Sequence, residues 1–215
     1  MRFRHVILPF LLVTGYRPTS ALAQVAIDAF TGTAYNFHTP LSISQEGEAD
    51  LDFTAHYDTR PLEDTPYFGA RVSVWKGNRA FVVTLVHHKL YLSNPPSEVG
   101  WFRITYGFNM GTVGLGWRRG NLSYTVGAGA VITHASSMVR GKRYLGTGGP
   151  LNRGYTFSGA TAVASVQYKV PLSKAIYLSG ETMASASYIE VSVKDGQAHV
   201  PAAALHFHAG VGYAF

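Results

Sequence analysis

The feature that most constrains this chain is a regular alternation of apolar residues with small or polar ones. In residues 122–132, Tyr124 and Val126 alternate with Ser123 and Thr125. The same pattern returns in the stretches 71–75, 176–181 and 205–215, the last of which ends on Phe215. A period of two places the two sets on opposite faces of a strand. Alternating segments of about ten residues between turn residues are typical of membrane-spanning barrel strands.

The connections between these segments predict the topology. Three are short (76–78, 118–121 and 170–173) and four are long (39–65, 93–101, 133–153 and 191–201). Outer-membrane barrels place short turns in the periplasm and long loops outside. The sequence therefore predicts an all-β fold, an eight-stranded antiparallel up-and-down transmembrane β-barrel with both termini in the periplasm. The predicted strands are 25–37, 66–75, 79–91, 103–117, 121–132, 154–169, 174–190 and 202–215.

The second strand has an alternative start. Residues 50–58 also alternate, so this strand could begin near residue 50 and pass through a bulge at Pro61 or Pro66. In either version the sheet must close, because an open edge in hydrocarbon leaves backbone groups unpaired. A ring of eight strands leaves a lumen that side chains fill. Aromatic residues near the strand ends are predicted to form two interfacial girdles, namely Trp75, Trp117, Tyr168, Tyr177 and Tyr213 on one side and Tyr106, Tyr155 and Tyr188 on the other.

A soluble, lipocalin-like barrel is the alternative fold, and the two folds predict opposite walls. A membrane barrel turns its apolar residues outward, whereas a soluble one turns them inward. The membrane interpretation therefore requires Tyr124, Val126, Phe207 and Val211 on the outside, and Ser123 inside. We expect this arrangement because the second set of each strand is small or polar.

The N-terminal residues 1–23 have the features of a signal peptide. Arg2 and Arg4 precede the apolar run Val6–Val13, and Ala21-Leu22-Ala23 provides a cleavage site. The apolar run is far shorter than the ~20 residues that a membrane helix needs. We therefore expect export through the periplasm to the cell outer membrane, with residues 24–215 forming the barrel domain.

Composition narrows the classes of partner and chemistry. The chain has no cysteine, which excludes disulfides, thiolate metal ligands and a cysteine nucleophile. Beyond residue 23 it carries 15 basic and 12 acidic residues, because three of the 18 arginines and lysines lie in 1–23. A net charge of +3 does not point to nucleic acid but suits anionic lipid head groups. We expect a membrane-embedded monomer whose partner is outer-membrane lipid. Nucleophile-elbow, zinc-protease and phosphate-loop motifs do not occur.

Strand parity sorts the polar residues of the outer half. His206 and His208 share a face with Gly210, so both should face the lumen, where a histidine pair can ligate a metal or relay a proton. The alternative is that the two rings hydrogen-bond within a packed interior. Arg71 and Glu181 also fall on lumen faces, and we expect them to pair because lone buried charges are costly.

The third strand carries its polar residues on both faces. His87, Lys89 and Tyr91 share the face of Leu85 and should lie at the lipid-facing rim, whereas His88 should point inward. A rim lysine and histidine could bind a lipid phosphate. Ordinary snorkelling of long side chains toward the interface is the alternative.

Several short segments, in order along the chain, resemble the lipid A oxidase family of outer-membrane barrels. Residues 66–71, which lead to Trp75, resemble its PPYYGxR…WW segment, and residues 84–91 (TLVHHKLY) resemble EFTHxKVY. The further matches are residues 105–109 (TYGFN) to T-D/H-G-x-N, residues 127–134 (GAGAVITH) to GAGxxxPH, and residues 154–159 (GYTFSG) to Y-x-L-T-G. This chain departs from the family pattern at Thr84, where the family has Glu, and at Thr133, where it has Pro.

The resemblance implies an enzyme that modifies lipid A of lipopolysaccharide in the outer leaflet. Family members oxidise the proximal glucosamine to an aminogluconate with molecular oxygen. The catalytic positions that the motifs imply are His87, Tyr91, Asn109 and His134, with Lys89 binding substrate. We add Arg140 as a second phosphate-binding candidate. Oxygen chemistry implies a divalent metal ion, for which His206 and His208 are the candidate ligands.

Two other functions stay open. One is a non-enzymatic small barrel that acts as a scaffold, an adhesin or a narrow conduit through its long loops. The other is a lipid A acyl hydrolase or transferase that uses a Ser/His pair, such as His134 with Ser136 or Ser187 with His206. The mass of lipid A separates the three functions. One added oxygen supports the oxidase, an acyl difference supports the hydrolase, and no change leaves the non-enzymatic barrel.

Overall fold

The computed structural model describes residues 24–146 and 154–215, and the predicted signal peptide lies outside this part of the chain. The described residues form one antiparallel sheet. Its ring strands are β1 (Gln24–Asn36), β5 (Phe68–Lys76), β6 (Arg79–Leu92), β7 (Val99–Arg119), β8 (Leu122–Val139), β10 (Thr156–Pro171), β11 (Ile176–Val193) and β12 (Gly196–Ala214). Four shorter strands are β2 (Thr39–Gln45), β3 (Leu51–Ala55), β4 (Tyr57–Asp58) and β9 (Lys142–Leu145). The described ranges contain no helix long and apolar enough to cross a membrane.

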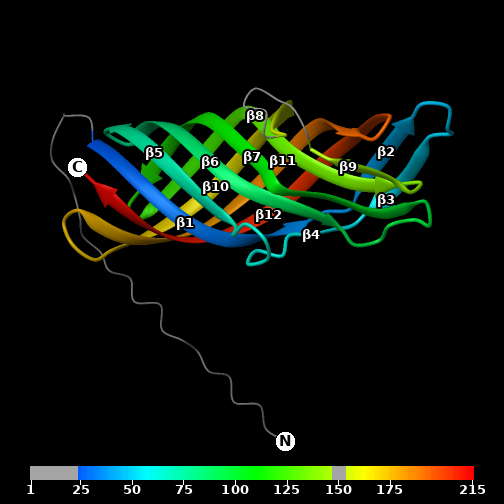
Figure 1. Cartoon of the computed structure of the whole chain (residues 1–215). Coiled ribbons are helices and arrows are strands. Elements are labelled where there is room, and N and C mark those ends of the chain that lie inside the picture. Colours follow the sequence, from blue (N-terminus) through cyan, green and yellow to red (C-terminus); the bar gives the residue numbers. More distant parts are fainter. Residues whose placement is uncertain (1–23, 147–153) are drawn as a thin grey trace, which may run out of the picture.

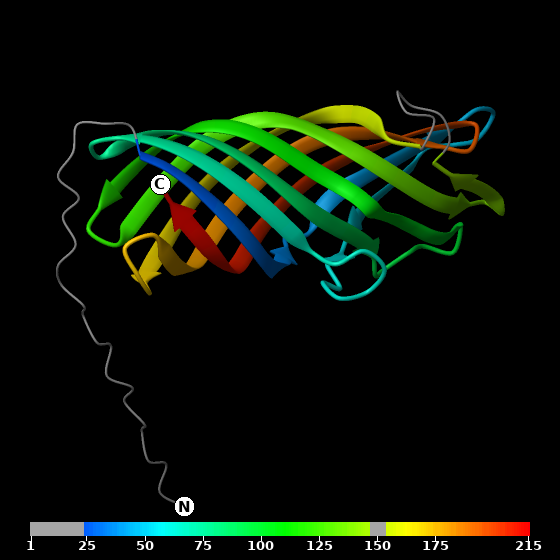
Figure 2. The same ribbon diagram turned by 60° about the vertical axis from the view of Figure 1, so that its left-hand side comes forward.

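The eight ring strands close into a barrel, as Figures 1 and 2 show. Each strand pairs with the next in the chain order of the ring, and β1 completes the circle by pairing with β12 from Ala26↔Ala214 to Asn36↔Ala204. Short turns join the strands at the end that holds Gln24 and Phe215. This end is the periplasmic one, because outer-membrane barrels keep their short turns there. The predicted fold class is confirmed.

The wall has the polarity of a membrane barrel. On β8, Tyr124 and Val126 are 40% and 48% exposed on the outside. Ser123, the residue before Tyr124, is only 7% exposed and points inward. Phe207 and Val211 on β12 are 46% and 48% exposed, and His208 beside them is 6% exposed. Apolar side chains therefore cover the outside of the wall, and polar side chains fill its inside. We refer to this outward apolar surface as the lipid belt.

The lumen within the lipid belt is filled by a polar network. The Arg71 guanidinium donates to the Glu181 carboxylate at 2.6 Å and to the Thr84 hydroxyl at 3.1 Å, and both members of the ion pair are buried. The expected Arg71–Glu181 pair is thus confirmed. Nearer the periplasm, Tyr177 and Gln167 donate to the Asp28 carboxylate at 2.9 and 3.1 Å. The polar residues predicted to fill the lumen do so through direct hydrogen bonds.

Two residues expected in the aromatic girdles point inward instead. Trp75 is 4% exposed and packs with Ala26, Ala80 and Val82, while the Arg118 guanidinium lies 4.8 Å from the centre of its ring. Tyr177 is 7% exposed and bonds to Asp28. Both alternate with exposed apolar neighbours, so strand parity, not aromatic character, decides their side. Their rings help to close the periplasmic end of the lumen.

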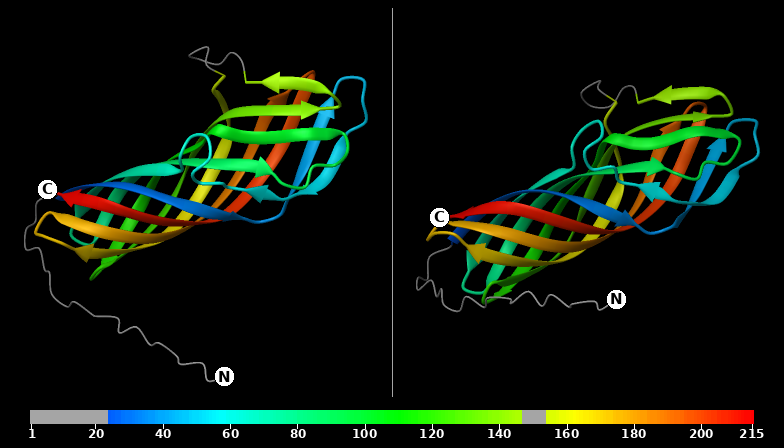
Figure 3. Two further views of the ribbon diagram at one scale, coloured as in Figure 1. Left: turned by 60° about the horizontal axis from the view of Figure 1, so that its bottom comes forward. Right: turned by 90° about the horizontal axis from the view of Figure 1, so that it is seen from below.

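The outer loops contain more strand than the sequence indicated. Residues 51–55 do not begin the second ring strand; they form β3, which pairs with β2, and β2 in turn pairs with the first residues of β12. Strands β8, β11 and β12 extend to Val139, Val193 and Gly196, well into the predicted loops. The wall therefore continues beyond the lipid belt, and Figure 3 shows these strands extending to the end of the barrel away from the C-terminus.

This outer extension encloses an apolar core. Its largest fully buried side chains include Leu41, Ile43, Phe102, Ile104 and Ile189, which all belong to one cluster. Here the polarity of the wall is inverted relative to the belt, because water surrounds this part of the barrel and burial of apolar surface stabilises it. The interior of the barrel thus changes from polar within the belt to apolar above it.

We predict that Arg71 and Glu181 stabilise the barrel only when both are present. Arg71→Leu should lower the free energy of unfolding by about 3–5 kcal/mol, because it leaves the Glu181 charge buried without its cation. The double variant Arg71→Leu/Glu181→Leu should regain much of that loss. Urea unfolding of the barrel in lipid vesicles measures both. A double variant that is less stable than the single one would contradict the assignment.

Candidate functional site

A group of polar and aromatic side chains lies on the outside of the wall, directly above the outer edge of the lipid belt. We call it the outer-wall cluster. Three neighbouring strands and the start of a fourth contribute to it. Its members are His87 of β6, Thr105, Tyr106 and Asn109 of β7, His134 of β8, and Tyr155, which precedes β10. Strand pairing brings them together, because His87 is opposite Asn109 and Asn109 is opposite Ile132.

His87 and Asn109 form the centre of the outer-wall cluster. The His87 Nδ1–H donates to the Asn109 side-chain carbonyl at 2.8 Å, and the imidazole stacks on Phe68 with the ring centres 5.0 Å apart. This bond fixes the tautomer, so the His87 Nε2 carries a lone pair. Within residues 24–146 and 154–215 that nitrogen has no hydrogen-bond partner, and neither has the buried Thr105 hydroxyl. Unpaired buried polar atoms are costly, which makes both atoms candidates for a ligand contact.

A bulge in β7 shapes the other side of the cluster. Pairing with β8 is interrupted between Ile104 and Phe108, and His134 lies opposite the interruption. The His134 ring is 5.6 Å from the Tyr106 ring and 5.3 Å from the Tyr155 ring, and the Tyr155 hydroxyl donates to the Tyr106 carbonyl at 2.8 Å. Bulges redirect side chains in this way next to functional sites. The bulge therefore holds His134 of β8 on the same outer surface as His87 of β6, with β7 between them.

The segment 60–67 covers the next residues of β6. Lys89 donates to the Glu63 carbonyl, the Tyr91 hydroxyl donates to the Asp64 carboxylate at 2.8 Å, and the Arg60 guanidinium lies 4.7 Å from the centre of the Tyr91 ring. Burial and the bond to Asp64 raise the pKa of Tyr91, so its hydroxyl keeps its proton. Strand parity predicts Lys89 and Tyr91 at the lipid-facing rim. They do point outward, but the first outer loop buries them.

Arg140 does not join the outer-wall cluster. It lies in the turn between β8 and β9, and its guanidinium donates to Glu98 and to the Ala49 carbonyl, both at 2.8 Å. It follows His134 by six positions, which is about 20 Å along a strand. Its donors already tie the outer loops together.

The two lumen histidines are held by protein partners on all four ring nitrogens. His208 donates to Glu181 at 2.9 Å and accepts from the Tyr67 hydroxyl at 2.8 Å. His206 donates to the Tyr67 oxygen and accepts from the Ser185 hydroxyl, both at 2.8 Å. Each ring is buried. This is the packed, hydrogen-bonded arrangement given as the alternative to a metal site. His88 points inward as expected and donates to the side-chain carbonyl of Asn36 at 3.0 Å.

Sequence reasoning found some members of the cluster and missed others. His87, Asn109 and His134 were identified as site residues through the motif segments. Tyr106 and Tyr155 were assigned to a girdle, and the roles of Thr105 and of the covering segment 60–67 were not expected. The motif segments 105–109 and 154–159 contain three of these residues, so position within the motifs was the available signal.

Comparisons with known proteins support the fold. No protein-family model and no curated protein matches the chain. The solid-state NMR structure of the outer membrane protein AlkL in DMPC lipid bilayers is similar, with a TM-score of 0.55 and 13% identity over 95% of this chain and 97% of AlkL. The crystal structure of Ail, the attachment invasion locus protein of Yersinia pestis, has a TM-score of 0.40 and 13% identity over 90% of this chain and 99% of Ail. The AlkL fold, together with the lipid belt, is that of an outer-membrane barrel.

We predict that Gly107→Ala breaks the His87–Asn109 bond and leaves the barrel intact. A Cβ at this position would lie 2.2 Å from the Asn109 side-chain nitrogen and 3.0 Å from the Tyr155 ring, so the amide must move. The loss of stability should be about 1 kcal/mol. Nitrogen NMR of the His87 ring in micelles should show a mixture of tautomers. Gly111→Ala is the control, because a Cβ there has nothing within 4 Å. Unchanged His87 signals in Gly107→Ala would contradict the assignment.

Proposed function

We propose that this protein is an outer-membrane enzyme that modifies lipid A in the outer leaflet, with the outer-wall cluster as its site. One observation carries the proposal. His87 lies in the outward register of β6 just above Leu85, which belongs to the lipid belt, and its buried Nε2 has no hydrogen-bond partner in the described structure. The sugars of lipid A begin at that height of the membrane. His87 is only 4% exposed, so a lipid reaches this nitrogen only when neighbouring side chains move aside.

The arrangement suits removal of a proton from a sugar hydroxyl. Asn109 holds the His87 ring by its Nδ1–H, so that Nε2 is the basic atom and can accept the proton. The Thr105 hydroxyl on the neighbouring strand is also buried without a partner and offers a further hydrogen bond to the sugar. The resemblance to lipid A oxidases supports oxidation of the proximal glucosamine to an aminogluconate by molecular oxygen as the reaction. In balance, the two hydrogens lost from a C1 hemiacetal pass to oxygen, which leaves as hydrogen peroxide, and water opens the lactone, so that the sugar gains one oxygen. Lys89 and Tyr91 become available to the lipid only when the segment 60–67 moves aside, because that segment covers them.

The two departures from the family pattern do not alter the outer-wall cluster. Thr84 is a lumen residue that accepts from the Arg71 guanidinium at 3.1 Å, next to Glu181. Thr133 is fully buried, and its hydroxyl bonds to Ser158 at 2.6 Å. A glutamate at position 84 would approach Arg71, whose charge is already balanced here by Glu181 of β11. The departures thus concern the interior packing.

A metal does not fit the residues that the sequence suggested for it. The ring nitrogens of His206 and His208 are all occupied by Tyr67, Glu181 and Ser185. No group of three or more His, Asp or Glu residues is arranged as a metal site in the described part of the chain. We therefore assign no step to a metal held by the lumen pair.

The alternative functions have different support. The side-chain hydrogen bonds of the described residues include one Ser–His pair, Ser185 with His206, which lies in the lumen away from lipid. This disfavours an acyl hydrolase or transferase. A non-enzymatic barrel is favoured by one observation, the apolar core that fills the outer extension and suits a scaffold or an adhesin. That core also disfavours a conduit.

We predict that expression of the protein adds one oxygen to lipid A and that His87→Gln abolishes the change. Loss of a general base typically lowers a rate by 10²–10⁴-fold. Mass spectrometry of lipid A from cells with and without the protein measures the product. His199→Gln is the matched control, because His199 also faces outward but lies at the far end of the wall, near Glu190.

The mass spectra separate the possible functions. An unchanged lipid A mass in cells that hold the folded barrel would exclude the enzyme and leave the scaffold or adhesin. A change in acyl chains would support the hydrolase. Full activity of His87→Gln would remove the outer-wall cluster from the proposal.

A further inference from the structure

The sheet is interrupted between the outer end of β1 and the short strand β4. Strand β5 begins only at Phe68, which pairs with Thr31, so the outer end of β1 lacks a β5 neighbour. Strand β4 pairs with β6 alone. Side chains bridge the interruption, because the Asn36 amide donates to the Tyr57 carbonyl at 3.1 Å and the Thr59 hydroxyl donates to the Ala34 carbonyl at 3.0 Å. A discontinuity of this kind leaves room for a pocket in the wall.

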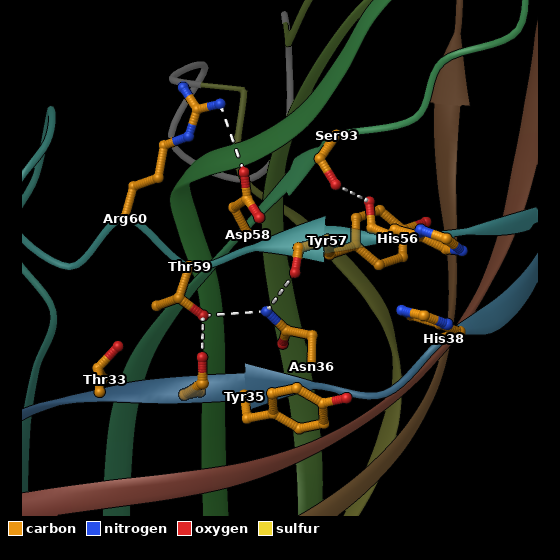
Figure 4. Close-up of a pocket in the computed structure, with 11 residues that line it drawn as sticks. Thr33, Tyr35, Asn36, His38, His56, Tyr57, Asp58, Thr59, Arg60 and Ser93 are labelled. Carbon is orange, nitrogen blue, oxygen red and sulfur yellow. Dashed lines mark hydrogen bonds and ion pairs between the residues drawn. The ribbon is translucent and has the colours of Figure 1, made fainter.

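A polar pocket of about 460 Å³ opens at this interruption, and Figure 4 shows its lining. Its size falls within the usual range of roughly 300–1,000 Å³ for small-molecule sites. The residues that matter here are Tyr35, Asn36, His38, His56, Asp58 and Arg60. We call it the β1–β4 pocket. It is separate from the outer-wall cluster, and its Arg60 also contacts the Tyr91 ring of β6.

The polar groups of the β1–β4 pocket keep free hydrogen-bonding capacity. The Arg60 guanidinium donates to Glu63 at 3.4 Å through one nitrogen, and its other terminal nitrogen lies 3.6 Å from the Asp58 carboxylate, beyond hydrogen-bond distance. The side chains of Arg60 and Asp58 are about half exposed. The His38 and His56 rings stack with their centres 3.6 Å apart. In the described ranges, the ring nitrogens of His38 and His56 make no hydrogen bond to protein, and His56 bonds only through its backbone. Arg60 also has a left-handed backbone, with φ of 47°, which non-glycine residues rarely adopt without a reason.

The position of the pocket relative to the membrane indicates which part of a lipid reaches it. Tyr35 and Phe37 are 57% and 48% exposed at the outer end of β1, and their rings meet edge to face. Exposed aromatic residues mark the boundary between hydrocarbon and head groups. The pocket begins at that boundary, so a molecule standing in the outer leaflet would present its head group there.

We propose that the β1–β4 pocket binds the saccharide part of an outer-leaflet glycolipid. Sugar hydroxyls both donate and accept hydrogen bonds, and the pocket offers both kinds of group on Asp58, Arg60 and the two imidazoles. The single Arg60 guanidinium faces two carboxylates, Asp58 and Glu63, and this favours hydroxyl groups over a phosphate. The exposed Tyr35 ring provides a flat surface for the face of a sugar ring. The site binds whether or not His87 performs chemistry.

The test measures binding without turnover. The full chain, refolded in a detergent without sugar groups, is titrated with rough lipopolysaccharide and with phosphatidylglycerol. Asp58→Asn/Arg60→Gln should weaken lipopolysaccharide binding by about tenfold or more, because hydrogen bonds to charged groups are lost. Binding of phosphatidylglycerol should stay unchanged. Lys142→Gln/Asp195→Asn is the matched control, since it removes an ion pair of 3.4 Å and similar exposure elsewhere on the wall.

His56→Gln provides a second variant that leaves the ion pair in place, and it should also weaken lipopolysaccharide binding. A difference in gel mobility between unheated and heated samples verifies that each variant is folded. Equal lipopolysaccharide affinity in the wild type and in both pocket variants would overturn the proposal. A parallel loss of phosphatidylglycerol binding would overturn it too, because recognition would then be of phosphate. Lipid A mass is not part of this readout, so failure of the proposed enzyme would leave the binding result standing.

Discussion

Closure of the sheet in hydrocarbon is the constraint on which the rest of the structure depends. No water is present there to satisfy backbone N–H and C=O groups, so the ladder must run without a break around the ring. The pairing of β1 with β12 completes it. Closure turns every second residue inward, and the inward charges must then find each other. The Arg71–Glu181 pair and the Tyr67 bridge between His206 and His208 follow from this.

Above the lipid belt the constraint relaxes, and both candidate sites lie where it does. Water can satisfy backbone groups there, so β7 can bulge at residues 105–107 and β5 can begin only at Phe68. The bulge presents His134 beside the Asn109–His87 pair. The late start of β5 leaves the β1–β4 pocket and frees the segment 60–67 to cover Lys89 and Tyr91. Reactive or binding side chains thus occur at the interruptions of an otherwise regular wall.

Strand parity explains how much of this could be predicted. It gave the barrel, the lumen positions of Arg71, Glu181 and His88, and the outward direction of His87. It would also have placed Trp75 and Tyr177 inside, had it been weighed above their aromatic character. Parity does not indicate where a strand ends or what covers its outer face. The pairing of β2 with β12, and the burial of Lys89, depend on contacts between segments distant in the sequence, which local pattern does not contain.

The most direct test of the account is the environment of the outer wall. The chain has no cysteine, so single-cysteine variants at Val126, Phe207, Ser123 and His208 can each carry one spin label in a lipid bilayer. Labels at 126 and 207 should be relaxed strongly by lipid-soluble oxygen and weakly by a water-soluble nickel complex. Labels at 123 and 208 should be protected from oxygen. The reverse pattern, with positions 126 and 207 reached by the nickel complex, would contradict a lipid-facing barrel.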